Sequence, residues 1–198
     1  MTAPRLVYLH GFVSSPASRK AQQLVAWMAA NAPAIEVRVP ALHHDPRVAL
    51  GEARAACEGI DPTRLTVVGS SLGGFYATVI AEATGCRAAL LNPAVHPQRL
   101  FEKHLGPHEN LHTGERFELT REHVAALAAM DPPAITHPGR YWLIAEKGDE
   151  VLDWRDAAAY FAGARQSLVE GGDHALASFS DFLPGLADFA RAPAEATT

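Results

Sequence analysis

The sequence predicts an α/β fold in which about six mostly parallel strands are flanked by helices. Short β-branched or apolar runs alternate along the chain with alanine-rich segments that have helical spacing. Strands that alternate with helices in this way are typical of a parallel sheet that helices cover on both faces. The 198 residues are 48% hydrophobic and 20% charged, which is the composition of a globular protein.

Six segments are predicted as strands because they are short, apolar and rich in β-branched or large side chains. They are residues 5–10, 36–40, 64–69, 88–93, 141–148 and 165–172. Five segments have apolar residues at helical spacing and are predicted as helices. They are residues 18–32, 45–59, 72–85, 153–164 and 176–190, with Pro184 near a break in the last.

The stretch from about residue 94 to 138 is too long for a single crossover helix. It predicts a helix at its start, a polar loop broken by Gly and Pro, and a helix over residues 120–130. We interpret it as a small helical cap at the rim of an active site. Leu127 and Met130, on its apolar face, are expected to line an acyl-binding pocket. No linker or repeat divides the chain, so we expect a single domain over residues 1–198.

Charge and hydropathy exclude several classes of partner. The formal net charge is −5, and no cluster of Lys and Arg offers a footprint for nucleic acid. No apolar run approaches the roughly 18 residues of a membrane span. The start of the chain, MTAPRLVYLHGF, lacks the basic-then-apolar layout of a secretory signal. We therefore expect a cytoplasmic protein that acts on a small molecule.

The stretch VVGSSLGGF contains the pattern G-x-S-x-G where a predicted strand turns into a predicted helix. Only Ser71 has glycine two positions before it and two after it, at Gly69 and Gly73. At such a turn the strand and the helix pass so closely that side chains at these two positions would clash. Ser71 is therefore the candidate nucleophile, and Ser70 is expected to be a pocket or turn residue.

A serine hydroxyl needs a histidine base and a carboxylate that orients the base. His174 follows the last predicted strand and a glycine turn, and Asp149 follows the strand before it. The chain order Ser71, Asp149, His174 is the order of the α/β-hydrolase fold. Asp153 is the rival acid, but its position favours a helix N-cap, and Asp173 is expected to be a turn residue.

The segment LVYLHGF ends a strand and enters a loop that resembles the H-G element of esterases. In that element a backbone N–H after the glycine helps to bind the oxyanion of the tetrahedral intermediate. We predict that the backbone N–H groups of Phe12 and Leu72 are the donors. Gly11 and His10 are candidate substrate-binding residues, although His10 is equally well explained as a brace for the turn.

The remaining histidines and the cysteines do not predict a metal or a cofactor. HLGPHENLH has a four-residue step, but its Gly-Pro pair would interrupt the helix needed to align the rings, and H-E-x-x-H is absent. Cys57 and Cys86 have no redox or metal spacing and are interpreted as reduced packing residues. The other histidines weighed as ligands are His43, His44, His96, His104, His108, His112, His123 and His137.

The chain is similar to a known family along most of its length. The stretches that carry the resemblance are YLHGFVSSPASRKA, GSSLGGFYAT, NPAVHP, TGERFELTREH, KGDEVLDWRDAAAYF and EGGDHAL. They resemble the small YqiA/YcfP-type (UPF0227-like) esterases of the α/β-hydrolase superfamily, from Leu6 to about Phe189. The resemblance implies a compact serine esterase with Ser71, Asp149 and His174 as nucleophile, acid and base.

The sequence thus predicts a serine esterase that hydrolyses carboxylic acyl esters or acyl thioesters through an acyl-enzyme intermediate. Acyl transfer or peptide hydrolysis by the same three residues stays open, because pocket shape chooses the acceptor. A non-catalytic ligand-binding protein on this fold is a further alternative, since fold does not fix function.

Overall fold

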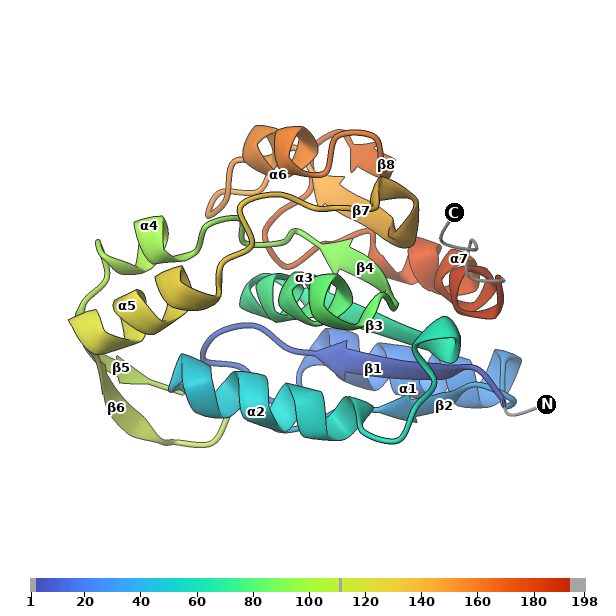
Figure 1. Cartoon of the computed structure of the whole chain (residues 1–198), viewed down its shortest axis with the longest axis horizontal. Helices are drawn as coiled ribbons and strands as arrows, with labels where there is room; N and C mark the ends of the chain where they lie inside the picture. Colours follow the sequence, from blue (N-terminus) through green and yellow to red (C-terminus); the bar gives the residue numbers. More distant parts are fainter. Residues whose placement is uncertain (1–2, 111, 193–198) are drawn as a thin grey trace.

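The computed structural model describes residues 3–110 and 112–192 and consists of one six-stranded sheet, one two-stranded hairpin and seven α-helices around them (Figure 1). The strands of the large sheet are β1 (Arg5–Leu9), β2 (Glu36–Arg38), β3 (Leu65–Ser70), β4 (Arg87–Leu91), β7 (Tyr141–Glu146) and β8 (Arg165–Val169). The hairpin strands are β5 (Gly106–Glu109) and β6 (Arg116–Leu119). The helices are α1 (Arg19–Asn31), α2 (Pro46–Cys57), α3 (Leu72–Thr84), α4 (Gln98–Phe101), α5 (Arg121–Met130), α6 (Trp154–Tyr160) and α7 (Phe179–Arg191).

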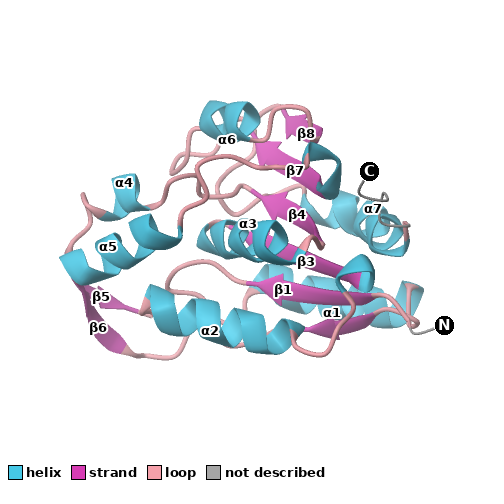
Figure 2. Ribbon diagram, viewed as in Figure 1, coloured by secondary structure: helices cyan, strands magenta, loops and turns pink. Residues whose placement is uncertain are grey.

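The large sheet confirms the predicted fold class. Its strands lie in the order β2-β1-β3-β4-β7-β8, and every neighbouring pair is parallel. All six strands predicted from the sequence are present. In Figure 2 the helices lie on both sides of this sheet, with α2, α3 and α6 in front and α1 and α7 behind.

Alternating side chains of the four inner strands, β1, β3, β4 and β7, enter two separate cores, one on each face of the sheet. Val7 and Leu9 of β1 pack into the core beneath α2 and α3, whereas Leu6 and Tyr8 pack into the core beneath α1 and α7. All four of these side chains are at most 1% exposed. Burial on both faces explains why these strands are continuous apolar runs rather than alternating ones.

The strand order favours a ligand-binding crevice at the carboxyl ends of β1 and β3. After β1 the chain passes through α1 to β2 on one side, and it then returns through α2 to β3 on the other side of β1. Open parallel sheets bind ligands outside the carboxyl ends of strands at such a reversal. The segment after β1 and the turn after β3 meet there. The inserted elements α4, α5, β5 and β6 gather at this end of the sheet, away from both termini (Figure 1).

The structure corrects three details of the sequence prediction. The polar loop predicted inside the insertion contains the antiparallel hairpin β5–β6, and the helix before it is a single turn, α4. The C-terminal helix does not break at Pro184, because α7 continues through that residue from Phe179 to Arg191. Its strongly amphipathic face holds Leu183, Leu186 and Ala187 in the core on both sides of the proline, which offsets the lost backbone hydrogen bond.

In the part of the chain that the structure describes, none of the helices has both the length and the apolar character needed to cross a bilayer.

Candidate active site

Ser71 occupies a strained turn between β3 and α3. Its backbone has φ 54° and ψ −120°, a conformation that costs a non-glycine residue on the order of 1–3 kcal/mol. Three backbone hydrogen bonds hold it there. The Ser71 N–H donates to the carbonyl of Leu91 at 3.0 Å, and the Ser71 carbonyl accepts from the N–H groups of Gly74 and Ala94 at 2.9 and 3.0 Å. The turn therefore has a fixed position relative to the end of β4.

The glycines around Ser71 are required by close backbone contacts. A Cβ at Gly69 would lie 2.2 Å from the carbonyl oxygen of Gly73, and a Cβ at Gly73 would lie 2.1 Å from that of Leu9. These are the clashes that the sequence pattern predicts at both positions. Gly11 approaches from the loop after β1, where an added Cβ would lie 3.2 Å from Cβ of Ser71.

Ser71, His174 and Asp149 form a continuous hydrogen-bonded chain. The Ser71 Oγ lies 3.0 Å from Nε2 of His174, and Nδ1 of His174 lies 2.8 and 3.0 Å from the two carboxylate oxygens of Asp149. A carboxylate only accepts hydrogen bonds, so the proton of the neutral ring belongs on Nδ1. Nε2 is then free to accept the proton of the Ser71 hydroxyl.

Asp149 is an ionised, almost fully enclosed carboxylate. Its side chain is 2% exposed, against 24% for His174. Oδ1 also accepts the backbone N–H groups of Val151 and Leu152 at 2.8 and 2.9 Å. Burial raises the pKa of Asp149, but the hydrogen bonds from His174, Leu152 and Val151 outweigh it and hold the pKa below its usual range. The negative charge beside the imidazole is therefore kept at neutral pH.

The two rival aspartates take other places. Asp153 is the N-cap of α6, where its side chain accepts the N–H of Arg155 at 2.9 Å. Asp173 is exposed. Its backbone forms the hydrogen bonds: the N–H donates to the carboxylate of Glu146, and the carbonyl accepts from the side chain of Asn92. Neither carboxylate contacts the His174 ring.

The predicted oxyanion donors lie on the two segments beside Ser71. Leu72 is the first residue of α3, so its N–H is one of the donors that have no acceptor within the helix. Among the described residues, neither this N–H nor that of Phe12 donates to a protein acceptor. Gly11, Phe12 and Leu72 line a common hollow of about 20 Å³.

His10 braces the loop after β1 and is 3% exposed. Its Nε2 accepts the N–H of Leu42 at 3.0 Å, which leaves Nδ1 to donate to the carbonyl of Gly11 at 3.0 Å. Burial lowers the pKa of His10, with an opposing contribution from the Gly11 hydrogen bond, so the ring is neutral. Of the two interpretations open from the sequence, this geometry favours the brace.

A cleft of about 430 Å³ opens beside Ser71 and His174. Ser70 and Gly11 line it, and Ser70 also forms a hydrogen bond with Tyr8 in its wall. The remaining lining residues are mostly polar, and they are Phe12, Ser14, Ser18, Arg19, Lys20, Gln23, Glu150, Asp173, Ala175, Leu176 and Ala177.

Leu127 and Met130 do not line this cleft, which corrects their assignment to an acyl pocket. Leu127 is 0% exposed and belongs to the core beneath α2 and α3, and Met130 packs against the same core. The apolar stripe of α5 is therefore a packing surface. The insertion reaches the site through Phe12, whose ring contacts Phe101 and Phe117 at centroid distances of 4.8 and 5.6 Å.

Two residues that the sequence analysis did not single out hold the His174 loop. Glu146, the last residue of β7, is 1% exposed. Its carboxylate accepts the N–H groups of Asp173, Ala177 and Ser178 at 2.7, 3.0 and 2.7 Å, and the Ser178 hydroxyl at 2.6 Å. Asn92 accepts the Glu146 N–H at 2.9 Å and donates to the carbonyl of Asp173 at 2.9 Å.

Burial raises the pKa of Glu146, but these hydrogen bonds outweigh it and keep the pKa below its usual range. The sequence signals this anchoring of the His174 loop only by an acidic residue at the end of a strand that is predicted to be buried.

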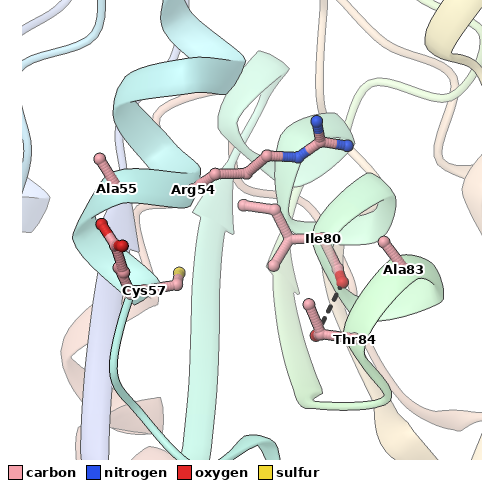
Figure 3. A pocket seen from close by; sticks show the side chains of 7 residues that line it. Arg54, Ala55, Cys57, Ile80, Ala83 and Thr84 are labelled. Carbon is pink, nitrogen blue, oxygen red and sulfur yellow. Dashed lines mark hydrogen bonds between the residues drawn. The ribbon is translucent and has the colours of Figure 1, made fainter.

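A larger hollow lies far from Ser71 and has no comparable chemistry. It measures about 500 Å³ and lies between the C-terminal ends of α2 and α3, at the opposite edge of the sheet (Figure 3). Its one candidate nucleophile is Cys57, and burial raises the pKa of that thiol to about 12. The thiol is therefore unreactive at neutral pH. Cys57 and Cys86 are both free cysteines that pack in the core, as expected.

The order and direction of the strands and the helices on both faces of the sheet are those of the α/β-hydrolase fold. Solved structures with the same fold include an alpha/beta hydrolase domain-containing protein 10 from mouse, with TM-score 0.73 and 13% identity over 95% of this chain and 90% of that one. Est1E from Butyrivibrio proteoclasticus gives TM-score 0.68 and 12% identity over 95% and 87% of the two chains. The esterase domain from a Rhodothermus marinus protein gives 0.64 and 19% over 96% and 88%.

The chain belongs to the uncharacterised protein family UPF0227, whose model matches residues 5–191. This match covers nearly all of the described residues and confirms the resemblance drawn from the sequence motifs.

Proposed function

We propose that the protein is a serine hydrolase that cleaves carboxylic acyl esters or acyl thioesters. The observation that carries the proposal is the hydrogen-bonded chain from Ser71 Oγ through His174 to Asp149, with distances of 3.0 and 2.8 Å. It supplies a nucleophile, a base of the correct tautomer and a charge that orients the base. The strained backbone of Ser71 supports the same role, because strain of this kind gathers at functional sites.

In the proposed reaction His174 Nε2 takes the Ser71 proton while Oγ attacks the acyl carbon. The tetrahedral oxyanion is bound by the N–H groups of Phe12 and Leu72, each worth about 3 kcal/mol of transition-state stabilisation. Protonated His174 then gives its proton to the leaving alcohol or thiol. Water, deprotonated by His174 in turn, attacks the acyl-enzyme; the bond from the acyl carbon to Ser71 Oγ breaks, the carboxylic acid is released, and His174 returns its proton to Oγ.

The cleft supports a small-molecule substrate that carries polar groups near the reacting carbonyl. Arg19 and Lys20, at the start of α1, and Gln23 line it together with the catalytic pair. Lys20 Nζ donates to the carbonyl of Ala175 at 2.8 Å, so it also ties α1 to the His174 loop. This wall would solvate an anionic or hydroxyl-bearing group better than a long alkyl chain.

Covalent labelling with a fluorophosphonate tests the proposal directly. We expect the purified protein to be labelled and the Ser71→Ala variant to be unlabelled and inactive toward butyrate esters and acyl thioesters, with an unchanged circular dichroism spectrum. Ser70→Ala is the matched control at the same turn and should still be labelled. Equal labelling of Ser71→Ala and wild type would overturn the assignment of the nucleophile. Turnover of amides in preference to esters would reassign the protein as a peptidase.

A further inference from the structure

Three side chains that commonly bind metal ions gather outside the Ser71 cleft. His43 and His44 lie in the segment between β2 and α2, and Glu115 lies directly before β6 of the inserted hairpin. One ligand atom from each of the three lies within 4.8 Å of the other two. The proposed hydrolysis uses none of these side chains, so the cluster calls for a separate explanation.

The spacing of His44 and Glu115 suits two ligands of one metal ion, and a ligand atom of His43 lies within 4.8 Å of both. Two ligands of a tetrahedral zinc ion with bonds of about 2.05 Å lie roughly 3.3 Å apart. Nδ1 of His44 and Oε1 of Glu115 are 3.0 Å apart, so an ion would replace the proton that they share. The His43 ring lies beside them, with its centroid 4.0 Å from that of His44. Its Nδ1 accepts the N–H of Asp45 at 2.9 Å, a hydrogen bond that coordination through this nitrogen would exchange for a metal bond.

The surroundings hold two of these residues in place before any ion binds. The His44 ring stacks on Phe117, with centroids 4.2 Å apart and planes within 9°. The backbone N–H of His43 donates to the carboxylate of Glu52 at 2.7 Å. The side chains of His44 and Glu115 are 21% and 44% exposed, so an ion can reach them from solvent.

We propose that His43, His44 and Glu115 form a binding site for a divalent transition metal ion such as Zn²⁺ or Ni²⁺. Two imidazoles and one carboxylate favour these ions over Mg²⁺ and Ca²⁺, which select oxygen ligands. Three protein ligands leave a fourth position for water. The three side chains border the same hollow as the proposed oxyanion donors Phe12 and Leu72. They take no part in the proposed hydrolysis, and the existence of the metal site does not depend on the proposed function.

An ion at this site would clamp the loop after β1 between two elements. On one side, the segment that carries His43 and His44 holds His10 through the N–H of Leu42. On the other side, the hairpin that carries Glu115 holds the loop through Asn110, whose side chain donates to the carbonyl of Ser14 at 2.9 Å. Joining the two sides restrains the loop that contains the proposed donor Phe12. Metal binding should therefore stabilise the folded protein.

Thermal unfolding of the full, untagged chain after treatment with EDTA tests the site. We expect Zn²⁺ and Ni²⁺ to raise Tm in a concentration-dependent manner, with one ion bound per chain by isothermal titration calorimetry. Mg²⁺ and Ca²⁺ should leave Tm unchanged. Glu115→Gln and His43→Gln should each weaken binding at least tenfold while leaving the Tm of the metal-free protein close to that of wild type.

His137→Gln is the matched control, because His137 is an exposed histidine outside the cluster. It should bind Zn²⁺ and Ni²⁺ as the wild type does. The proposal is overturned if the wild type binds neither ion, or if Glu115→Gln and His43→Gln bind them as tightly as His137→Gln. Fluorophosphonate labelling of the metal-free protein reports on the proposed hydrolase separately, so failure of one proposal can be told from failure of the other.

Discussion

The two aspartates that follow β7 have different roles, because their carboxylates contact different groups. Asp149 and Asp153 are four residues apart and both follow β7, yet the first binds the His174 ring and the second caps α6. The sequence predicted this division, because chain order favoured one residue and cap position the other. It did not predict that Oδ1 of Asp149 also binds the backbone at Val151 and Leu152, since that contact depends on the path of the turn.

We predict that Asp149→Asn lowers kcat by about 10⁴-fold, the loss known for the equivalent change in a serine protease. The asparagine oxygen can keep the bonds to Val151 and Leu152, so its amide NH₂ faces His174 Nδ1 and favours the wrong tautomer. Asp153→Asn is the matched change and should alter neither kcat nor stability much, because asparagine caps helices well. Steady-state kinetics with an activated ester, together with urea unfolding, measures both. Normal turnover in Asp149→Asn would contradict this assignment.

Two features of the fold, the role of Glu146 and the hairpin β5–β6, are not revealed by sequence patterns. Glu146 follows the apolar run of β7, where a strand end predicts an exposed side chain, yet it binds the whole His174 loop. The hairpin β5–β6 was missed because GPHE and RFEL contain a glycine, a proline and charges and are largely exposed. By contrast, the Ser71 turn was predictable because its glycines are required by local backbone clashes.

Glu146→Gln should destabilise the protein by about 2–4 kcal/mol, because its amide NH₂ would face backbone N–H donors and leave at least one of them unsatisfied. Turnover should also fall, since the freed loop carries His174. The matched variant is Glu150→Gln, which alters an exposed carboxylate that accepts the N–H of His174 at 3.0 Å. It should unfold at nearly the same urea concentration as the wild type. If the two variants have the same stability, Glu146 is not the anchor of the loop.

The stability of the whole molecule should depend on pH in two steps. His10 is buried and neutral, and its folded pKa lies below the ordinary value of 6.5. Glu146 and Asp149 are held ionised, with folded pKa values below 4.5 and 3.8. A folded pKa lower than the unfolded one contributes stability above the unfolded pKa, and that stability is lost as the pH falls through the folded pKa.

We therefore predict a first decrease in the free energy of unfolding as the pH falls below 6.5, and a steeper one below 4.5. Urea unfolding at pH values from 7.5 to 3 measures both. His10→Gln should flatten the first decrease without removing the second, whereas His137→Gln should change neither. A stability that is constant between pH 7.5 and 5 would show that protonation of His10 is not linked to unfolding.

The proposed nucleophile and base are joined across a large sequence separation. Ser71 and His174 are 103 residues apart, and the bond from Lys20 to Ala175 spans 155. During synthesis the N-terminal half, with its strained serine turn, leaves the ribosome before the segment that carries the histidine exists. A nascent chain therefore exposes Ser71 without a base, and the pair can form only once β8 and α7 have joined the sheet. Under the proposed function, a partly made chain therefore has no hydrolytic activity, and the activity is acquired in one late step.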